Sequence, residues 1–202
     1  MIVYLIAGQG ERDAIATLLS GHTYEIRPYP DVAAFLAEAD LEPPGCVLID
    51  VQPSDPTAMR ELRAIRRSLP IIALSSRANV ALAVRAMKEG AADFLQKPIE
   101  PEKLDAAVRA ALDESRAWFE RGRKKRELLA RFESLSTRER DVVDAVMHGC
   151  ANREVASQLG IKPRTVEIHR SNAMSKLGAR TLPDLVRIWL DVGSSLAQLN
   201  AE

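Results

Sequence analysis

The sequence has 202 residues, enough for one large or two small domains, and its apolar content of 47% is normal for a globular protein. Its formal net charge is zero, but residues 1–115 hold 12 Lys and Arg against 17 Asp and Glu, whereas residues 116–202 hold 16 against 11. A basic C-terminal half suits a polyanionic partner. Only two cysteines are present, which argues against a disulfide framework or a cysteine-based zinc site. No signal-peptide pattern and no apolar run near ~18 residues occur, so we expect a cytoplasmic protein without a membrane span.

The first 115 residues alternate short apolar runs with stretches of helical periodicity. Apolar runs at residues 2–6 and 46–49 are typical of strands buried on both faces of a parallel sheet, and residues 24–29, 71–74 and 94–95 suit three further strands. Between them apolar residues recur at helical spacing, and Pro101 begins a further helix. Five such alternations predict an α/β fold with a doubly wound, five-stranded parallel sheet.

Polar side chains follow the predicted strands at their carboxyl ends. Asp50 follows the third strand, Ser75 the fourth and Lys97 the fifth. In parallel sheets these ends meet at one edge, so an acid, a hydroxyl and a lysine would converge there as a phosphate site. The alternative is a solvated rim of unrelated polar residues. We expect Lys97-Pro98 to be a cis bond that turns Lys97 inward.

Residues 116–133 predict a linker helix. Trp118, Leu128, Leu129 and Phe132 lie at helical positions, with a basic run between them, and Gly122 is a candidate interruption. The basic run is most often a solvated face. It would otherwise lie near DNA phosphates or dock on the acidic N-terminal half.

Residues 134–196 predict a helical domain around a helix-turn-helix. Ser136 with Glu139 three residues later forms a capping box. A short helix at 152–159, a turn at Gly160 and a helix at 162–177 then follow, which is the pattern that places a second helix in the DNA major groove. The alternative is an ordinary amphipathic surface helix.

The exposed face of the helix at 162–177 carries the candidate DNA-binding residues. We expect base contacts from Glu167, Ile168 and Ser171. Phosphate contacts are expected from four basic or polar residues, Arg164, Arg170, Asn172 and Lys176. Thr165 is a further candidate for DNA binding.

The run from Leu135 to Leu190 resembles the LuxR-type DNA-binding domain of the FixJ/NarL family of response regulators. The matching marks are Leu135, Ser136, Arg138 and Glu139, Asn152, Val155 and Ala156, Leu159, Gly160 and Ile161, and Thr165, Val166 and His169. In that family the helix that corresponds to the last one here dimerises. The resemblance therefore implies a homodimer that binds double-stranded DNA at half-sites about one helical turn apart.

Residues 1–115 resemble the receiver domain of the same family, which has a flavodoxin-like fold. The motifs are Leu48-Ile49-Asp50, Leu74-Ser75 and the series from Ala83 through Gly90 and Asp93 to Lys97-Pro98. The resemblance implies that Asp50 is the phospho-acceptor of a sensor kinase. It assigns the receiver switch to Ser75, Phe94 and Lys97.

The sequence departs from the family pattern after the first strand. A working receiver carries two acidic residues there that hold Mg²⁺, whereas this chain has Ala7 and Gly8. Only Asp50 and the Gln52 carbonyl remain at matching positions, and Glu11 and Asp13 are expected to face solvent. Because Mg²⁺ needs oxygen ligands to support phosphoryl transfer, we expect no metal and no cofactor. Asp50 would then pair with Lys97 and hold one receiver state.

The sequence therefore predicts a DNA-binding transcriptional regulator with an atypical receiver that works without Mg²⁺-dependent phosphorylation. Control by constitutive dimerisation, a small ligand or a partner protein is favoured. The alternatives are a conventional regulator switched at Asp50, a phosphoryl-transfer enzyme that uses Asp50 and Lys97, and an adaptor that titrates a kinase. We expect that the chain is not an enzyme. A redox switch at Cys46 or Cys150 is weaker, because both are expected to be buried.

Overall fold

The computed structural model describes residues 1–21, 23–38, 44–51, 58–65, 69–77 and 80–199. The chain divides into two compact units, Met1–Glu120 and Arg121–Glu202. The predicted boundaries at 115, 133 and 196 stay a prediction, and Gln52 lies outside the described residues.

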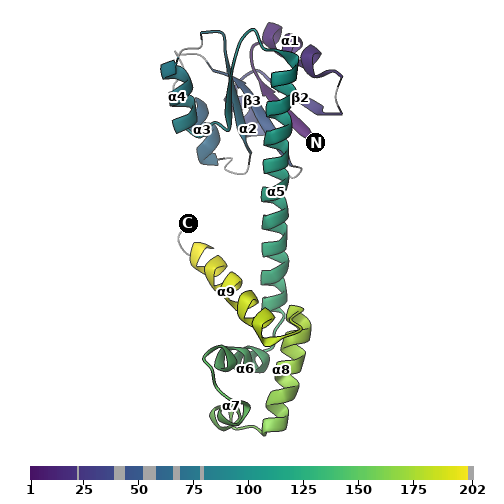
Figure 1. Ribbon diagram of the computed structural model, residues 1–202, viewed down its shortest axis with the longest axis vertical. Helices are drawn as coiled ribbons and strands as arrows, with labels where there is room; N and C mark the ends of the chain where they lie inside the picture. The colour runs from purple at the N-terminus through teal and green to yellow at the C-terminus, as the bar shows by residue number, and fades with distance from the viewer. Residues whose placement is uncertain (22, 39–43, 52–57, 66–68, 78–79, 200–202) are drawn as a thin grey trace. The chain divides into compact units, whose positions relative to one another are not determined.

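The first unit contains a parallel sheet of five strands in the order β2-β1-β3-β4-β5 (Figure 1). Each strand pairs in parallel with its neighbours. The predicted α/β fold class is thus confirmed. The strands are β1 Ile2–Ile6, β2 Glu25–Tyr29, β3 Gly45–Asp50, β4 Ile71–Ser75 and β5 Asp93–Gln96, and the helices are α1 Gln9–Leu19, α2 Val32–Glu38, α3 Ala58–Ile65, α4 Val80–Lys88 and α5 Pro101–Glu133.

Helices cover both faces of the sheet because alternate strand residues point to opposite sides. On one face Tyr4 packs against Phe35 of α2 and the same cluster includes Leu62 of α3. On the other face Leu5 packs in a cluster with Leu19 of α1 and Leu104 of α5. Burial on both sides explains why β1, β3 and β4 are continuous apolar runs.

Helix α5 runs from Pro101 to Glu133 without a break. The expected interruption at Gly122 is wrong, since an isolated glycine lowers helix stability by only about 1 kcal/mol and the flanking residues are good helix formers. Its first half buries Leu104, Val108 and Leu112 against the sheet. Near its end Phe132 packs on the ring of Trp189, with ring centroids 5.6 Å apart.

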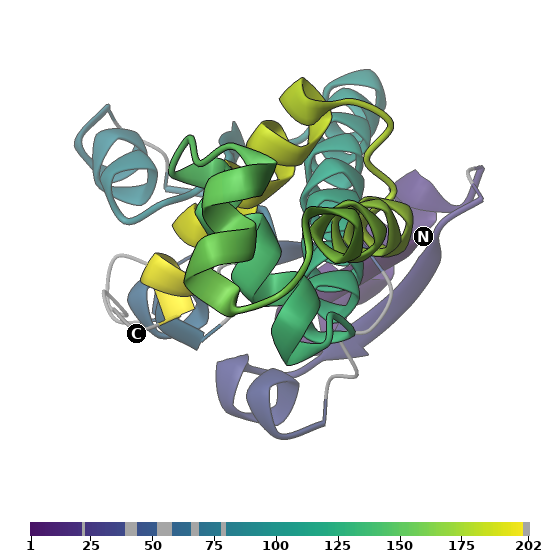
Figure 2. The same ribbon diagram turned by 90° about the horizontal axis from the view of Figure 1, so that it is seen from below.

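The second unit continues with helices α6 Thr137–Met147, α7 Asn152–Leu159, α8 Pro163–Leu177 and α9 Leu182–Leu199. Figure 2 looks almost along α8, which lies beside α6 and α7. Val142, Val155 and Val166 form one small core, and Val143, Leu177 and Leu185 contribute to a second. Residues after 193 were expected to form a frayed tail, but α9 continues through them to Leu199.

Candidate functional site

The carboxyl edge of the sheet brings Asp50, Ser75 and Lys97 to one end of the first unit. Asp50 ends β3, Ser75 ends β4, and Lys97 follows β5. The Lys97 Nζ donates to Oδ1 of Asp50 at 2.7 Å. Their side chains are 12% and 15% exposed, so the pair is largely shielded from water. The bond between Lys97 and Pro98 is cis, as expected.

Glu11 joins this pair and departs from the expectation that it faces solvent. Its Oε2 lies 2.7 Å from the same Lys97 Nζ, and its side chain is 45% exposed. The reason is that α1 begins at Gln9, which leaves Glu11 on the first turn beside the strand ends. Lys97 therefore holds two carboxylates, those of Asp50 and Glu11.

Ser75 and Phe94 flank this ion-pair cluster. Ser75 is buried, and its Oγ accepts the backbone N–H of Arg77 at 3.3 Å. Phe94 is half-buried and packs against the core cluster that includes Leu62 and Ala86. The backbone N–H of Lys97 donates to the Ser75 carbonyl at 2.9 Å, so β4 and the lysine are tied together.

Ala7 and Gly8, which stand where the family has its acidic pair, are small residues that line a cavity. Ala7 is buried, and a Cβ built on Gly8 meets no atom within 4 Å. The cavity holds about 260 Å³ and is lined by residues that include Ala7, Gly8, Asp31 and Asp50. Among the described residues, no three acidic, cysteine or histidine side chains gather to hold a metal ion. Residues 7 and 8 thus supply no side-chain oxygen to this cavity, whereas Mg²⁺ is usually bound by carboxylates and water.

The helix-turn-helix forms as the sequence predicts. Gly160 closes α7 at φ 65°, a left-handed conformation that glycine adopts without steric cost. Lys162 caps α8 with Pro163 in its first turn, and Gly178 ends the helix at φ 75°. Val166, Ala173 and Leu177 form the buried stripe of α8.

Most of the predicted DNA-binding residues share the outward side of α8. Glu167, Ser171 and Asn172 are exposed, and the side chain of Ile168 is 50% exposed. Thr165 and Arg170 are half-buried at its margins. Arg164 is exposed and pairs with Glu167, with Nη1 and Oε2 2.7 Å apart.

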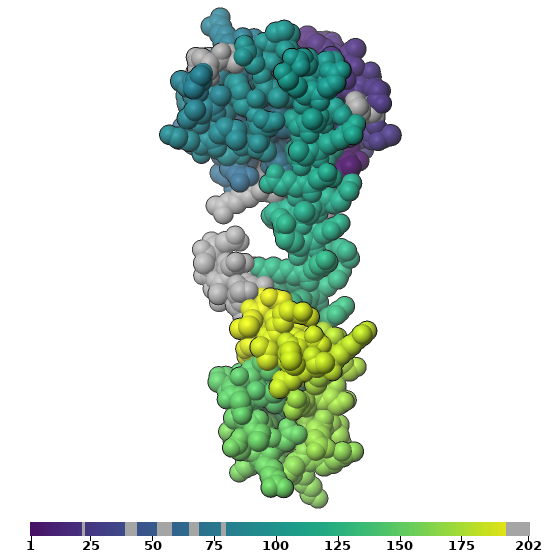
Figure 3. All heavy atoms as spheres, in the orientation of Figure 1, coloured from purple at the N-terminus to yellow at the C-terminus, as the bar shows by residue number. Residues whose placement is uncertain are grey.

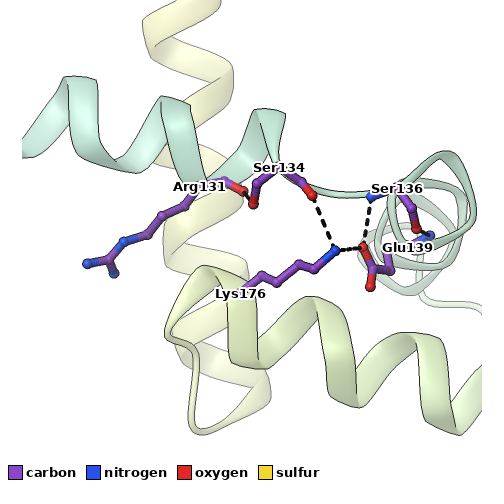
Figure 4. A network of polar contacts seen from close by, with 5 residues as sticks. All are labelled: Arg131, Ser134, Ser136, Glu139 and Lys176. Carbon is purple, nitrogen blue, oxygen red and sulfur yellow. Dashed lines mark hydrogen bonds and ion pairs between the residues drawn. The ribbon is translucent and has the colours of Figure 1, made fainter.

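Lys176 lies apart from the others and belongs to a polar network with Ser134, Ser136 and Glu139 (Figure 4). Its Nζ donates to Oε2 of Glu139 at 2.6 Å and to the Ser134 carbonyl at 3.2 Å. The same Glu139 oxygen accepts the Ser136 backbone N–H at 2.8 Å, which completes the predicted capping box. The hydrogen bond from Lys176, which outweighs the effect of burial, lowers the pKa of Glu139.

Comparisons with known proteins match both halves of the chain. Residues 9–109 match the response regulator receiver domain, and residues 133–189 match the family of bacterial regulatory proteins, luxR family. The transcriptional regulatory protein FixJ of Azorhizobium caulinodans is 39% identical over 188 residues, which cover 90% of this chain and 88% of that protein. The chain belongs to the FixJ/LuxR type of response regulators. It is thus a DNA-binding transcriptional regulator of the two-component class.

Solved structures agree with this assignment. The response regulator StyR superposes on the regulator with a TM-score of 0.81 at 29% identity, covering 93% of this chain and 96% of that one. Full-length FixJ from B. japonicum gives a TM-score of 0.54 at 32% identity, covering 96% and 97%. In its described part, none of the regulator's helices has both the length and the apolar character needed to cross a bilayer.

Two residues that line a groove beside α8 were not among the predicted DNA-binding residues. Asn152 at the start of α7 and Arg180 after α8 line a groove together with Glu167 and Arg170. Arg180 could have been noticed as a cation placed two residues after Gly178, the glycine that ends α8. Asn152 was noted only as one of the residues that match the LuxR-type domain.

The two cysteines differ in exposure. Burial raises the pKa of the Cys46 thiol to about 12, so this thiol is unreactive at neutral pH. Cys150 is only half-buried, against the expectation that both are buried. Cys150 Sγ accepts a long contact of 3.7 Å from Gln158.

Proposed function

We propose that this response regulator binds DNA as a homodimer through α8, and that its receiver is a pseudo-receiver whose state does not depend on Mg²⁺-dependent phosphorylation of Asp50. The observation that carries the receiver half is the ion-pair cluster of Lys97 with Asp50 and Glu11, beside residues 7 and 8 that offer no carboxylate. Phosphorylation would have to break the Lys97–Asp50 pair without a cation to neutralise the incoming phosphoryl oxygens.

The proposed DNA interface uses the outward side of α8. Glu167, Ile168 and Ser171 contact base edges, while residues at the margins contact phosphates. Lys176 is left out of this set because its ammonium already binds Glu139 and Ser134. The proposed phosphate contacts are Arg164, Arg170 and Asn172, with Thr165 as a further DNA contact. Arg164 is 83% exposed, so it can exchange its pair with Glu167 for a phosphate in water.

Replacing Arg170 with alanine is expected to weaken binding to every duplex. It should lower the slope of log Kd against log salt by about two units, one for each subunit of the dimer. Replacing Glu167 with alanine should instead relax sequence choice by about 1–3 kcal/mol at its base pair. It also releases Arg164, so binding to scrambled DNA should not weaken. Fluorescence anisotropy on a duplex selected from a random pool, and on its scrambled form, measures both.

Arg187→Ala is the matched control for these variants. Arg187 is an exposed arginine of the same unit, paired with Asp184 on α9 rather than placed on α8. Unchanged affinity and unchanged sequence preference in both α8 variants would remove α8 from the interface.

Dimerisation is supported by the exposed side of α9. Leu182, Val186 and Leu190 recur every four residues and are all exposed, a continuous apolar stripe on one helix face. Figure 3 shows the described part of α9, in yellow, at the surface of the second unit. A second copy of the chain would cover this stripe.

Sedimentation of the wild type before and after treatment with beryllofluoride and Mg²⁺ tests the pseudo-receiver. We expect a dimer in both conditions, because the fluoride complex requires a metal and Ala7 and Gly8 supply no carboxylate to hold it. A Leu190→Glu variant, which places a charge in the stripe, should sediment as a monomer. A monomer that becomes a dimer on treatment, and fails to do so in Asp50→Asn, would support the conventional phosphorylated regulator instead, with a sensor kinase as its partner.

A further inference from the structure

A groove borders the recognition helix on the side away from Lys176. It holds about 480 Å³ and lies between α8, the start of α7 and the loop that joins α8 to α9. It is continuous with the proposed DNA interface, since Glu167 and Ser171 belong to both. Its lining residues are Asn152, Glu167, Arg170, Ser171, Met174, Ser175, Ala179 and Arg180.

The charge in this groove is positive and uncompensated. In the described part of the chain, the guanidinium groups of Arg170 and Arg180 have no ion-pair partner. Glu167 is the acidic lining residue, and Arg164 neutralises it at 2.7 Å. Two free guanidinium groups across one groove favour an anion with several oxygens, because guanidinium presents a fork of N–H donors.

The loop that carries Arg180 is held in place by its neighbours. The backbone N–H groups of Arg180 and Thr181 both donate to Oδ2 of Asp184, at 3.2 and 3.1 Å. Gly178 and Ala179 return the chain at the end of α8, and Ala179 is buried. The base of the Arg180 side chain is therefore fixed before any ligand arrives, which lowers the entropy cost of binding.

Lys176 occupies a different side of the same helix. At about 100° per residue, a position six residues after Arg170 lies about 120° around the axis from it. Its ammonium is bound to Glu139 and to the Ser134 carbonyl, so a phosphate would have to compete with a largely buried carboxylate. Breaking that pair leaves Glu139 without its cation.

We propose that this groove seats a phosphodiester of the DNA backbone between Arg170 and Arg180, and that Lys176 is a positioning residue which holds α8 to the start of α6 and makes no contact with DNA. The inference rests on the proposed entry of α8 into the major groove. It adds Arg180, which lies outside α8, to the phosphate contacts. It removes Lys176, which the sequence analysis had assigned to them.

The slope of log Kd against log salt distinguishes these roles, because each phosphate contact contributes about one unit on any sequence. The full-length protein is titrated by fluorescence anisotropy against a labelled duplex of arbitrary sequence, between about 50 and 200 mM NaCl. Arg180→Ala should lower the slope by about two units, one for each subunit of the dimer. Over this range the variant therefore loses about 16-fold less affinity than the wild type. Arg180→Lys keeps the charge and should keep the slope.

Two further variants complete the test. Arg109→Ala, which removes an exposed arginine of the first unit that is paired with Asp105, should keep the wild-type slope. Lys176→Met should also keep it, although its affinity falls on every duplex, and Lys176→Arg should restore that affinity.

An Arg180→Ala protein with the wild-type slope would overturn the groove assignment. A Lys176→Met protein whose slope falls by about two units, with α6 still protected from hydrogen exchange, would show that Lys176 contacts phosphate. A wild-type protein that binds no duplex would contradict the proposed function of α8 itself, and not only the groove.

Discussion

Replacing Lys176 with methionine is expected to destabilise the DNA-binding unit by about 1–3 kcal/mol, because it leaves a largely buried carboxylate without its charged donor. The side chain of Glu139 is 6% exposed and lies in the first turn of α6. Methionine keeps most of the aliphatic stem of lysine, so the loss is mainly that of the ammonium. Amide hydrogen exchange of peptides from α6 and α8 should accelerate roughly 5- to 140-fold.

The pH dependence of this unit gives an independent control. The pKa of Glu139 is lowered in the folded protein, mainly by Lys176. Its stabilising contribution is therefore complete above the unfolded value of about 4.3 and is lost as the pH falls through the lower folded value. Lys176→Met should weaken this acid dependence, and Glu139→Gln combined with Lys176→Met should recover part of the stability at neutral pH. Wild-type exchange rates in Lys176→Met would show that the network contributes little.

Introducing aspartate at both positions 7 and 8 is expected to convert the receiver into one that takes up a phosphoryl group with Mg²⁺. The change places two carboxylates beside Asp50, which gives the metal the oxygen ligands that it lacks here. Gly8 has φ −62°, which any residue adopts, and its Cβ position is open. Intact-protein mass spectrometry after treatment with acetyl phosphate should detect the phosphoryl adduct in Ala7→Asp/Gly8→Asp and not in the wild type.

Ala7→Asn/Gly8→Asn is the matched control, because it fills the same space without charge. Asp50→Asn in the aspartate background should abolish the adduct. A wild-type protein that is phosphorylated as readily as the double variant would mean that residues 7 and 8 do not limit metal binding, and the pseudo-receiver proposal would fail.

Features determined by local residue chemistry were predictable from the sequence. The buried runs at β1, β3 and β4 indicated the parallel sheet, and the serine and glutamate three residues apart indicated the cap of α6. The meeting of Asp50 with Lys97 also followed, because the carboxyl ends of parallel strands share an edge.

Contacts between side chains on different helices and strands were not predictable in the same way. Glu11 was expected in solvent because a helix's first turn is usually exposed, yet Lys97 is close enough to bind it. Lys176 looked like a phosphate ligand because periodicity gives the face of a residue but not its partner, here Glu139 on α6. Arg180 was missed because it lies in a loop, where helical spacing carries no information.

The last turn of α5 affects where the domains of two related regulators can be joined in a chimera. Phe132 packs edge-to-face against Trp189, and Arg131 lies close to Gly178 at the end of α8. The Ser134 carbonyl accepts a hydrogen bond from Lys176. A chimera joined after Glu133 would graft a foreign helix end into the core of the DNA-binding unit. Exchange of sensory modules between relatives should therefore succeed when the junction lies earlier in α5, so that the transplanted DNA-binding unit brings its own final helical turn.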